Sequence, residues 1–258
     1  IGKDGRRQSG SILSPAFGVR LPGVQHPHHR TERQAMQPYD ITTIDGDGIG
    51  PEVCQATVAV LREACGSRLR FTAHPGGAAH YQRSGAVLPT DTEAACRASH
   101  AILHGAAGLP GVTYADGTEV GNDLHLQLRF RLDLFANVRP VKLYRGVQSP
   151  LRGWQPGQID FVVVRENTEG LYASRGAGVV LRGEVATDTL MVTRKGVERV
   201  ARFAFDLARQ RGGAPRDGQK RVTCCDKANI LRSYAFFRAV FDEVGAQYPE
   251  VQRDHAYA

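Results

Sequence analysis

The chain has 258 residues, of which 33 are Lys or Arg and 26 are Asp or Glu, so its net charge is +7 with histidine neutral. At roughly 100–200 residues per domain, this length predicts one large domain or two modest ones. Hydrophobic residues make up 41% of the chain, which is enough to build a core and excludes disorder of the whole chain. No apolar run approaches the roughly 20 residues of a membrane-spanning helix, so we expect no membrane partner.

The cysteines favour neither a disulfide scaffold nor a zinc ribbon. Their number is odd, and no two of them form a Cys-x-x-Cys pair. We therefore expect them to act as small apolar side chains in a reducing compartment, and we expect a cytoplasmic protein. The five are Cys54, Cys65, Cys96, Cys224 and Cys225.

Residues 1–35 differ from the rest of the chain. They hold six basic and two acidic residues and are rich in Gly, Pro, Ser and His, which predicts a disordered extension. A transit peptide or a nucleic-acid arm is the alternative. Phe17 is the one aromatic residue in this stretch, so the stacking side chains of a nucleic-acid site are missing, and we expect no nucleic-acid partner. Because Met36 directly precedes the first predicted strand, we favour upstream sequence foreign to the native protein.

Strands and helices alternate along the remainder. The predicted strands are 41–44, 69–73, 100–104, 159–164 and 221–225, and the predicted helices begin at Pro51, at Arg194 and after residue 225. The strand 159–164 is almost entirely β-branched or aromatic, which predicts a buried strand. In the helix from Pro51, apolar residues recur at helical spacing from Val53 to Ala64. The last helix is expected to turn Ile230, Tyr234, Phe237, Phe241 and Val244 inward. Such alternation predicts an α/β protein with a largely parallel sheet.

A glycine cluster at 46–50 joins the first strand to the first helix. Glycines at such a junction let backbone amides approach an anion at the helix N-terminus. The cluster lacks the full Gly-x-Gly-x-x-Gly spacing of a dinucleotide site. By itself it favours a plain strand-to-helix turn.

Arginines and polar loops indicate an anion-binding cleft. Arg165 directly follows the strand 159–164, at the end of the sheet where α/β proteins bind ligands. Lys227 similarly follows the strand 221–225. The planar fork of arginine matches the two oxygens of a carboxylate or phosphate. Further arginines stand at positions 129, 131 and 139.

Four motifs in order make the chain recognisable. They are Gly46-Asp47-Gly48-Ile49-Gly50-Pro51-Glu52, Asp133-Leu134-Phe135-Ala136-Asn137-Val138-Arg139-Pro140, Val164-Arg165-Glu166-Asn167-Thr168-Glu169-Gly170-Leu171-Tyr172 and Asp226-Lys227-Ala228-Asn229-Ile230. Over residues 40–258 the chain resembles the metal-dependent β-decarboxylating dehydrogenases, the family of isopropylmalate, isocitrate and tartrate dehydrogenases.

The resemblance implies a two-domain α/β fold with a central, mostly parallel sheet, incomplete at the C-terminus. Residues 36–134 would form the N-terminal part of the first, cofactor-side domain. Residues 135–258 would form the second domain, for substrate binding and dimerisation. In relatives the first metal-binding aspartate follows the segment that matches 255–258, so we expect the metal ligands beyond Ala258 and read the chain as truncated and inactive by itself.

The resemblance also implies a mechanism. These enzymes oxidise the C2 hydroxyl of a malate-like acid by hydride transfer to a nicotinamide cofactor, release carbon dioxide and protonate the enol. Matching positions make Arg129, Arg139 and Arg165 the grip on the substrate carboxylates. Tyr172 would donate the proton to the enol. Lys227 would act on the base side, supplied across the interface of a homodimer.

The family pattern implies cofactors as well. NAD is expected, with NADP left open, together with Mg²⁺ or Mn²⁺ as a Lewis acid. The cofactor-binding positions would be Gly48, Ile49, Gly108, Asn122 and Asn229. No metal ligand is assigned, because Asp226 and Asp254 are expected to be structural.

Substrate choice depends on the helix before Arg129. Isopropylmalate enzymes present two leucines there, and the matching positions are His125 and Leu126. A buried histidine needs partners for its ring nitrogens, so an apolar pocket is not assured. We favour 3-isopropylmalate narrowly over tartrate, D-malate or isocitrate. A non-catalytic regulatory subunit is the alternative of another class, disfavoured because Tyr172 and Lys227 are both present.

Overall fold

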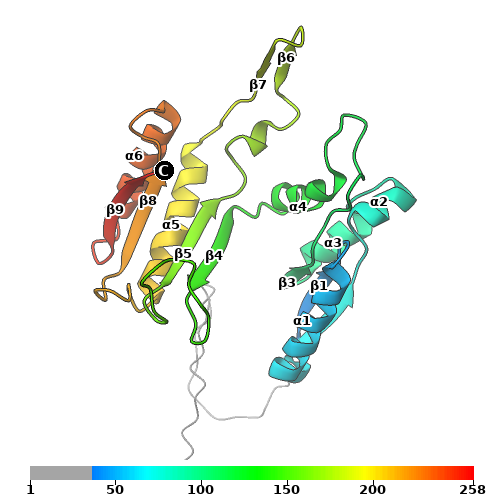
Figure 1. Cartoon of the computed structure of the whole chain (residues 1–258), viewed down its shortest axis with the longest axis horizontal. Coiled ribbons are helices and arrows are strands. Elements are labelled where there is room, and N and C mark those ends of the chain that lie inside the picture. Colours follow the sequence, from blue (N-terminus) through cyan, green and yellow to red (C-terminus); the bar gives the residue numbers. More distant parts are fainter. Residues whose placement is uncertain (1–36) are drawn as a thin grey trace, which may run out of the picture. The chain divides into compact units, whose positions relative to one another are not determined.

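The computed structural model describes residues 37–258, so the extension predicted over 1–35 lies outside the described part. Figure 1 shows the order of helices and strands. Within 37–258, no helix has the length and hydropathy needed to cross a membrane. The boundary between two domains near residue 135 stays a prediction.

The N-terminal part contains a three-stranded parallel sheet in the order β2-β1-β3. Its strands confirm the ones predicted at 41–44, 69–73 and 100–104. Four helices, α1 to α4, accompany it, and its core is built from Ile44, Val120 and Leu124, each fully buried. The elements are β1 (Tyr39–Ile44), α1 (Gly50–Cys65), η1 (Gly66–Arg68), β2 (Leu69–Ala73), α2 (Ala78–Ser84), α3 (Thr90–Ala98), β3 (Ala101–His104) and α4 (Val120–Arg131).

Helix α1 begins at the predicted place, but its apolar residues do not all face the core. Cys54 is buried, whereas Val53 and Val60 are exposed, Val60 to 67%. The buried line instead follows Gly50 and Cys54, which pack against the end of β1 and the loop after β3. Val53 and Val60 therefore form an exposed apolar line on this helix.

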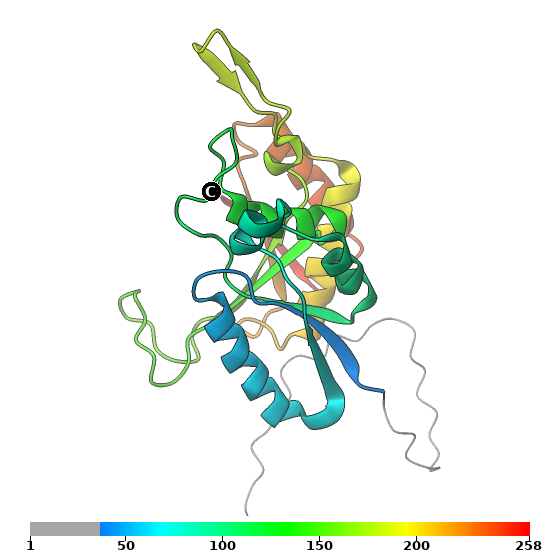
Figure 2. The ribbon, with the colours of Figure 1, turned by 90° about the vertical axis from the view of Figure 1, so that its right-hand side faces the viewer.

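The C-terminal part contains three two-stranded sheets. Strands β4 and β5 pair antiparallel, β6 and β7 form an antiparallel hairpin, and β8 and β9 pair parallel. Figure 2 shows the β6–β7 hairpin projecting from the segment after η2. The elements are β4 (Ala136–Lys142), β5 (Asp160–Glu166), η2 (Tyr172–Ser174), β6 (Val179–Leu181), β7 (Val185–Thr187), α5 (Arg194–Gln210), β8 (Arg221–Asp226), α6 (Arg232–Gly245) and β9 (Gln252–Tyr257).

The prediction of a buried strand at 159–164 is wrong in one respect. The strand exists as β5, but Phe161 and Val163 are 50% and 44% exposed. Successive side chains of a strand point to opposite faces. Helix α5 contacts β5, and the side chains that face away from it stay exposed. The pairing of β5 with β4 is antiparallel, whereas the parallel arrangement expected for the sheet holds for β1–β3 and for β8–β9.

Helices α5 and α6 enclose an aromatic core over β8. Phe205 of α5 lies against Phe241 of α6, with ring centroids 5.2 Å apart, and stacks on Tyr248 at 5.1 Å. Phe241 and Val244 are buried as predicted. Ile230 is not: it precedes α6, which begins at Arg232, and it is 72% exposed. Residues 227–231 form a turn that delays the helix.

The glycine cluster after β1 serves close packing around one buried carboxylate. Asp47 is 3% exposed and accepts backbone hydrogen bonds from Ala78 at 2.7 Å, Ala79 at 2.8 Å and Gly108 at 2.8 Å. Two of these amides begin α2, where a negative charge is favourable. Gly77, at φ +113°, precedes them, and a Cβ there would stand 2.6 Å from the Asp47 carboxylate. The carboxylate thus joins three segments of the chain.

Replacing Asp47 by Ala should destabilise the protein. Three buried amides would lose their acceptor, and we expect the free energy of unfolding to fall by about 3 kcal/mol. Urea denaturation of the purified chain measures this change. Asp116→Ala is the matched control, since within 37–258 the Asp116 carboxylate accepts hydrogen bonds only from the nearby Thr118, and it should change the free energy by less than about 1 kcal/mol. Equal losses in the two variants would contradict the role given to Asp47.

Candidate active site

Three arginines from three elements meet in the structure. Arg129 stands in the last turn of α4, Arg139 in β4 and Arg165 in β5. The pKa of Arg129 is lowered by burial and by the positive charges of Arg165 and Arg139, while Tyr172 acts in the opposite direction. Residues that are distant in sequence are therefore electrostatic neighbours. The cluster is positively charged and suited to an anion.

The register of β4 and β5 explains why two of these arginines share a face. Asn137 lies directly opposite Arg165, and Arg139 opposite Val163. Side chains two residues apart in a strand, and those directly opposite, point to the same side of the sheet. Arg139 and Arg165 therefore project together, and Nε of Arg139 donates to Oδ1 of Asn137 at 2.9 Å.

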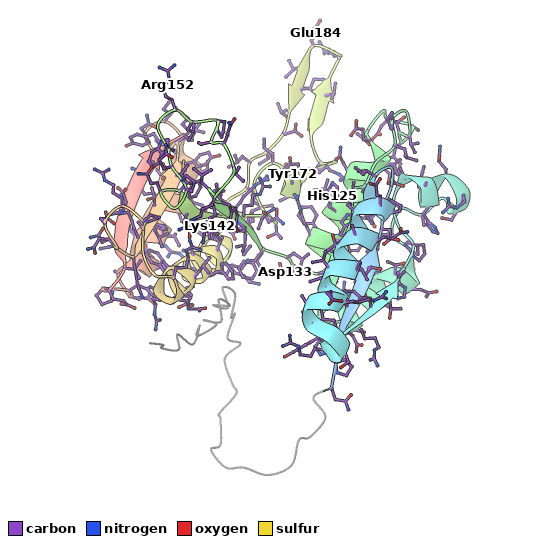
Figure 3. The ribbon with its side chains drawn as sticks, turned by 60° about the horizontal axis from the view of Figure 1, so that its bottom comes forward. His125, Asp133, Lys142, Arg152, Tyr172 and Glu184 are labelled. Carbon is purple, nitrogen blue, oxygen red and sulfur yellow. The ribbon has the colours of Figure 1, made fainter. Side chains whose placement is uncertain are left out.

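Tyr172 lies beside this cluster. It opens η2, and its ring centroid is 5.8 Å from the Arg165 guanidinium carbon. Three residues further on, Arg175 forms an ion pair with Asp123 of α4. This pair connects the segment that carries Tyr172 to the helix that carries Arg129. Figure 3 labels Tyr172 and His125 of α4.

Asp123 is a buried carboxylate with three side-chain donors. Besides Arg175, it accepts from the Tyr114 hydroxyl at 2.8 Å and the Gln127 amide at 2.6 Å. Burial by itself raises the pKa of Asp123, but the hydrogen bonds from Arg175, Gln127 and Tyr114 outweigh it and hold the pKa below its ordinary value. Burial is the larger cause that raises the pKa of Tyr114, and its hydrogen bond to Asp123 is the second. Asp123 is thus held ionised.

The two substrate-pocket candidates on α4 have different environments. His125 is half-buried, and its Nδ1 lies 3.5 Å from Nε2 of His104 at the end of β3. The pKa of His125 is lowered by burial, then by His104 and Arg129. Leu126 is 9% exposed and belongs to the hydrophobic core. His125, one helical turn before Arg129, is therefore the one that adjoins the arginine cluster.

Lys227 and Asn229 are exposed in the turn after β8. Within 37–258, Nζ of Lys227 forms no hydrogen bond or ion pair. Its neighbour Asp226 is 1% exposed and accepts hydrogen bonds from Nε and Nη2 of Arg238 and from the Ala228 amide. These contacts agree with a structural role for Asp226. The described residues do not bring Lys227 to Tyr172.

The positions predicted to bind the cofactor differ in exposure and in the hydrogen bonds that they already make. Gly48 and Ile49 are exposed at the start of α1, a helix with no side-chain cap, which leaves a helix N-terminus of the kind that binds anions. The Gly108 amide donates to Asp47, so it is already used. Nδ2 of Asn122 donates to Glu119 at 2.6 Å. Among these positions, Gly48 and Ile49 are the ones that lie exposed at a helix N-terminus.

The described residues do not form a metal site. No group of three or more His, Cys, Asp or Glu side chains that could hold an ion occurs within 37–258. Asp254 is exposed in β9, and Asp226 is paired with Arg238. We therefore derive no step through a divalent metal.

Three residues of this region have no role in the motifs. They are His104, which the sequence predicts only as part of a strand, and the ion-paired Asp123 and Arg175. That pair spans 52 positions, so no local spacing indicates it. A signal for His104 was present, since it ends the strand directly before a Gly-rich loop, where ligand-facing residues gather in α/β proteins.

Comparison with known proteins places this arrangement in a family. The sequence profile described as isocitrate/isopropylmalate dehydrogenase matches residues 40–258. The chain belongs to this family. The resemblance carried by the four motifs and the α/β fold class are thereby confirmed.

Family members of known name agree. The 3-isopropylmalate dehydrogenases of Bifidobacterium longum subsp. infantis and Clavibacter sepedonicus are 44% and 43% identical, over 85% and 84% of this chain. The matches cover 62% and 61% of those relatives, so the chain spans about three fifths of their length. The isocitrate dehydrogenase of Methylococcus capsulatus has a TM-score of 0.71 at 34% identity, covering 85% of this chain and 60% of that one. A β-decarboxylating dehydrogenase of Thermococcus kodakarensis gives 0.63 at 34%, covering 85% and 57%.

The Asp123 contacts predict a pH-dependent stability in this dehydrogenase-family chain. A carboxyl whose folded-state pKa is lowered stabilises fully above its unfolded pKa of about 4, and the contribution is lost as the pH falls through the folded pKa. Asp123→Asn should therefore reduce the free energy of unfolding by about 1–2 kcal/mol at neutral pH, with the difference shrinking below about pH 4. Urea denaturation across this pH range measures it. The exposed Asp91→Asn is the control, and a deficit independent of pH would contradict the assignment.

Proposed function

We propose that the protein catalyses the oxidative decarboxylation of a 3-substituted malate-type 2-hydroxy acid, with hydride transfer to NAD. The observation that carries the proposal is the meeting of Arg129, Arg139 and Arg165 beside Tyr172. The names of the 42–44% identical relatives favour 3-isopropylmalate as the substrate. Isocitrate, tartrate and D-malate share the malate frame and are the alternatives within the same reaction class.

The arginine cluster suits a substrate with two carboxylates. Three cations held near one another repel, and an anion that reaches all of them removes this repulsion. Each guanidinium can bind a carboxylate through two parallel hydrogen bonds, which fixes orientation as well as position. A dicarboxylic acid bound in this way has its carbon frame held in one pose. Holding the reacting group in a fixed pose supplies much of the rate enhancement of an enzyme.

Tyr172 is the proposed proton donor. After loss of carbon dioxide, the enol carbon must gain a proton, and a phenol beside the carboxylate grip can deliver it. The guanidinium of Arg165 lies against the Tyr172 ring, which sets the phenol beside the carboxylate grip. The base-side role belongs to Lys227 of the partner subunit in a homodimer.

NAD would accept the hydride from C2 of the substrate when it is bound. Gly48 and Ile49, at the start of α1, would hold its phosphate groups. Arg129, Arg139 and Arg165 hold the substrate independently of the cofactor, and Tyr172 acts on the enol. We place the enzyme in the cytoplasm, because all five cysteines are free thiols.

A catalytic chain is favoured over a regulatory subunit by a specific contact. A regulatory subunit has no need for a tyrosine next to the carboxylate grip. Here the Tyr172 ring lies against the guanidinium of Arg165, and Tyr172 acts to raise the pKa of Arg129. This placement is what the proton-donor role requires.

Replacing Arg165 by Ala should reduce kcat/KM by two to three decades. The substrate carboxylate would lose a bidentate partner, a loss of about 3–4 kcal/mol. Steady-state kinetics of the complete gene product with NAD, Mg²⁺ and 3-isopropylmalate measure it. Arg152→Ala removes an exposed arginine from the β4–β5 loop and serves as the control, with kcat/KM within about twofold of the parent. If the Arg165 variant had the same kcat/KM as the control, Arg165 would not bind the substrate carboxylate.

Tyr172→Phe separates proton donation from binding. The ring and its contact with Arg165 persist, so KM should stay within about threefold, while kcat should fall by roughly two to four decades. The same assay measures both constants. Tyr144→Phe, an exposed tyrosine after β4, is the matched control. An unchanged kcat in the Tyr172 variant would remove this residue from the mechanism.

A further inference from the structure

Arg199 of α5 contacts two segments that enter the arginine cluster. Its Nη1 donates to both carboxylate oxygens of Asp133, at 2.9 Å and 2.8 Å, and its Nη2 donates to the hydroxyl of Thr168 at 2.6 Å. Its guanidinium carbon lies 4.8 Å from the centroid of the Phe135 ring. Asp133, labelled in Figure 3, belongs to the short link between α4 and β4, and Thr168 belongs to the loop after β5. One side chain therefore joins the segment after α4 to the loop after β5.

The Thr168 hydroxyl extends this contact to the residue next to Arg165. It accepts from Arg199 and donates to Oε1 of Glu166 at 2.7 Å. The Glu166 carboxylate also accepts from the amides of Thr168 and Glu169, at 3.0 Å and 2.6 Å. These bonds fold the chain into a tight turn directly after Arg165. The turn is fixed to α5 through Arg199.

A second set of contacts connects the same turn to Arg139. Asn167 donates two hydrogen bonds to backbone carbonyls of the segment before β4, at 2.9 Å and 3.1 Å. Nδ2 of Asn137 donates to Oδ1 of Asn167 at 3.4 Å, and Oδ1 of Asn137 accepts from Nε of Arg139. Arg139 and Arg165 therefore stand on one hydrogen-bonded unit, and Arg199 joins this unit to α5.

The Arg199 guanidinium serves its partners better than it serves folding stability. Its side chain is 22% exposed. Within 37–258, its Nε is the one buried side-chain nitrogen or oxygen that lacks a hydrogen-bond partner. A buried donor without a partner lowers stability. Removing the guanidinium would relieve this loss, so we expect the removal to disturb the position of the turn more than it disturbs folding.

We propose that Arg199 is a positioning residue for the carboxylate grip, which keeps Arg139 and Arg165 aligned for one dicarboxylate without belonging to the grip itself. This inference rests on the proposed function and names a residue that holds its binding site in place. An arginine suits the role because its planar fork reaches two acceptors at once, whereas a lysine ammonium is a point charge. A misplacement of about 1 Å can reduce the activity of an enzyme by about 100-fold.

Steady-state kinetics and thermal unfolding of Arg199→Gln in the complete gene product test the proposal. With NAD, Mg²⁺ and 3-isopropylmalate, KM should rise by about 10-fold to 100-fold, because the grip loses its alignment. Tm should fall by less than about 4 °C. A variant that merely unfolds more easily contains less active enzyme, which lowers kcat and leaves KM unchanged. That result would overturn the proposal.

The matched control removes another arginine of the same helix. Arg202→Gln, three residues further along α5, replaces an exposed side chain whose Nη1 donates to Gln247. Its KM should stay within about twofold of wild type. If Arg199→Gln and Arg202→Gln had the same KM in an active enzyme, the inference about Arg199 would be wrong while the malate-type site stands.

Two milder substitutions remove one partner of Arg199 at a time. Asp133→Asn removes the charge, and asparagine tolerates the φ of +50° at this position. Thr168→Val removes the hydroxyl that connects Arg199 to the turn. Each should raise KM, by a smaller factor than Arg199→Gln does. An unchanged KM in both variants would contradict the positioning role.

A double-mutant cycle shows whether Arg199 acts through the grip. If Arg199 positions Arg165, then Arg199→Gln should reduce kcat/KM by a smaller factor in the Arg165→Ala background than in wild type. Two losses that multiply fully would mean that Arg199 acts independently of Arg165, and the proposal would fail. If wild type turns over none of 3-isopropylmalate, isocitrate, tartrate and D-malate, the proposed function itself is wrong and the inference falls with it.

Discussion

The buried carboxylate of Asp47 is the contact on which the candidate site depends. It holds the first amides of α2 and the amide of Gly108 in the loop after β3. Gly108 in turn touches the backbone of Gly121 in the first turn of α4, where a Cβ would stand 2.1 Å from its Cα. The position of α4, and with it Arg129, therefore depends on Asp47, just after the end of β1. One carboxylate thus aligns α2 and the loop before α4, and the glycines around it are needed for close approach of backbone to backbone.

The arginine cluster is held together against its own repulsion by contacts on its outside. Arg139 is fixed by Asn137 in its own strand, and Arg165 by the antiparallel register and the face of Tyr172. The pair of Asp123 and Arg175 connects α4 to the Tyr172 segment. Such prior positioning reduces the ordering that binding must impose, so more of the interaction with an anion is realised as affinity. The three charges are already electrostatic neighbours before any ligand arrives, as the proposed carboxylate grip requires.

Local patterns in the sequence were sufficient for most elements and for the arginines, but not for their surroundings. The strands β1 to β3 and β8, and the helix α5, follow from apolar periodicity, because burial of one face imposes it. The exposure of Phe161 and Ile230 could not be read from composition, since it depends on which neighbours cover a strand and where a turn delays a helix. The pair of Asp123 and Arg175 is a contact across 52 positions that only the folded chain brings together. The motif resemblance located Arg165 and Tyr172, whereas the partner of His125 required the structure.

The ring environment of one histidine in this site is decided by contacts made elsewhere in the fold. Helix α4 carries both Arg129 of the arginine cluster and His125 one turn earlier. A histidine can donate or accept with the same nitrogen, so its role depends on the contacts of its ring. Here the carbonyl of Ile44 and the ring of His104 supply those contacts. The environment of His125 thus originates in the parallel pairing of β1 with β3, which sets that carbonyl beside His104.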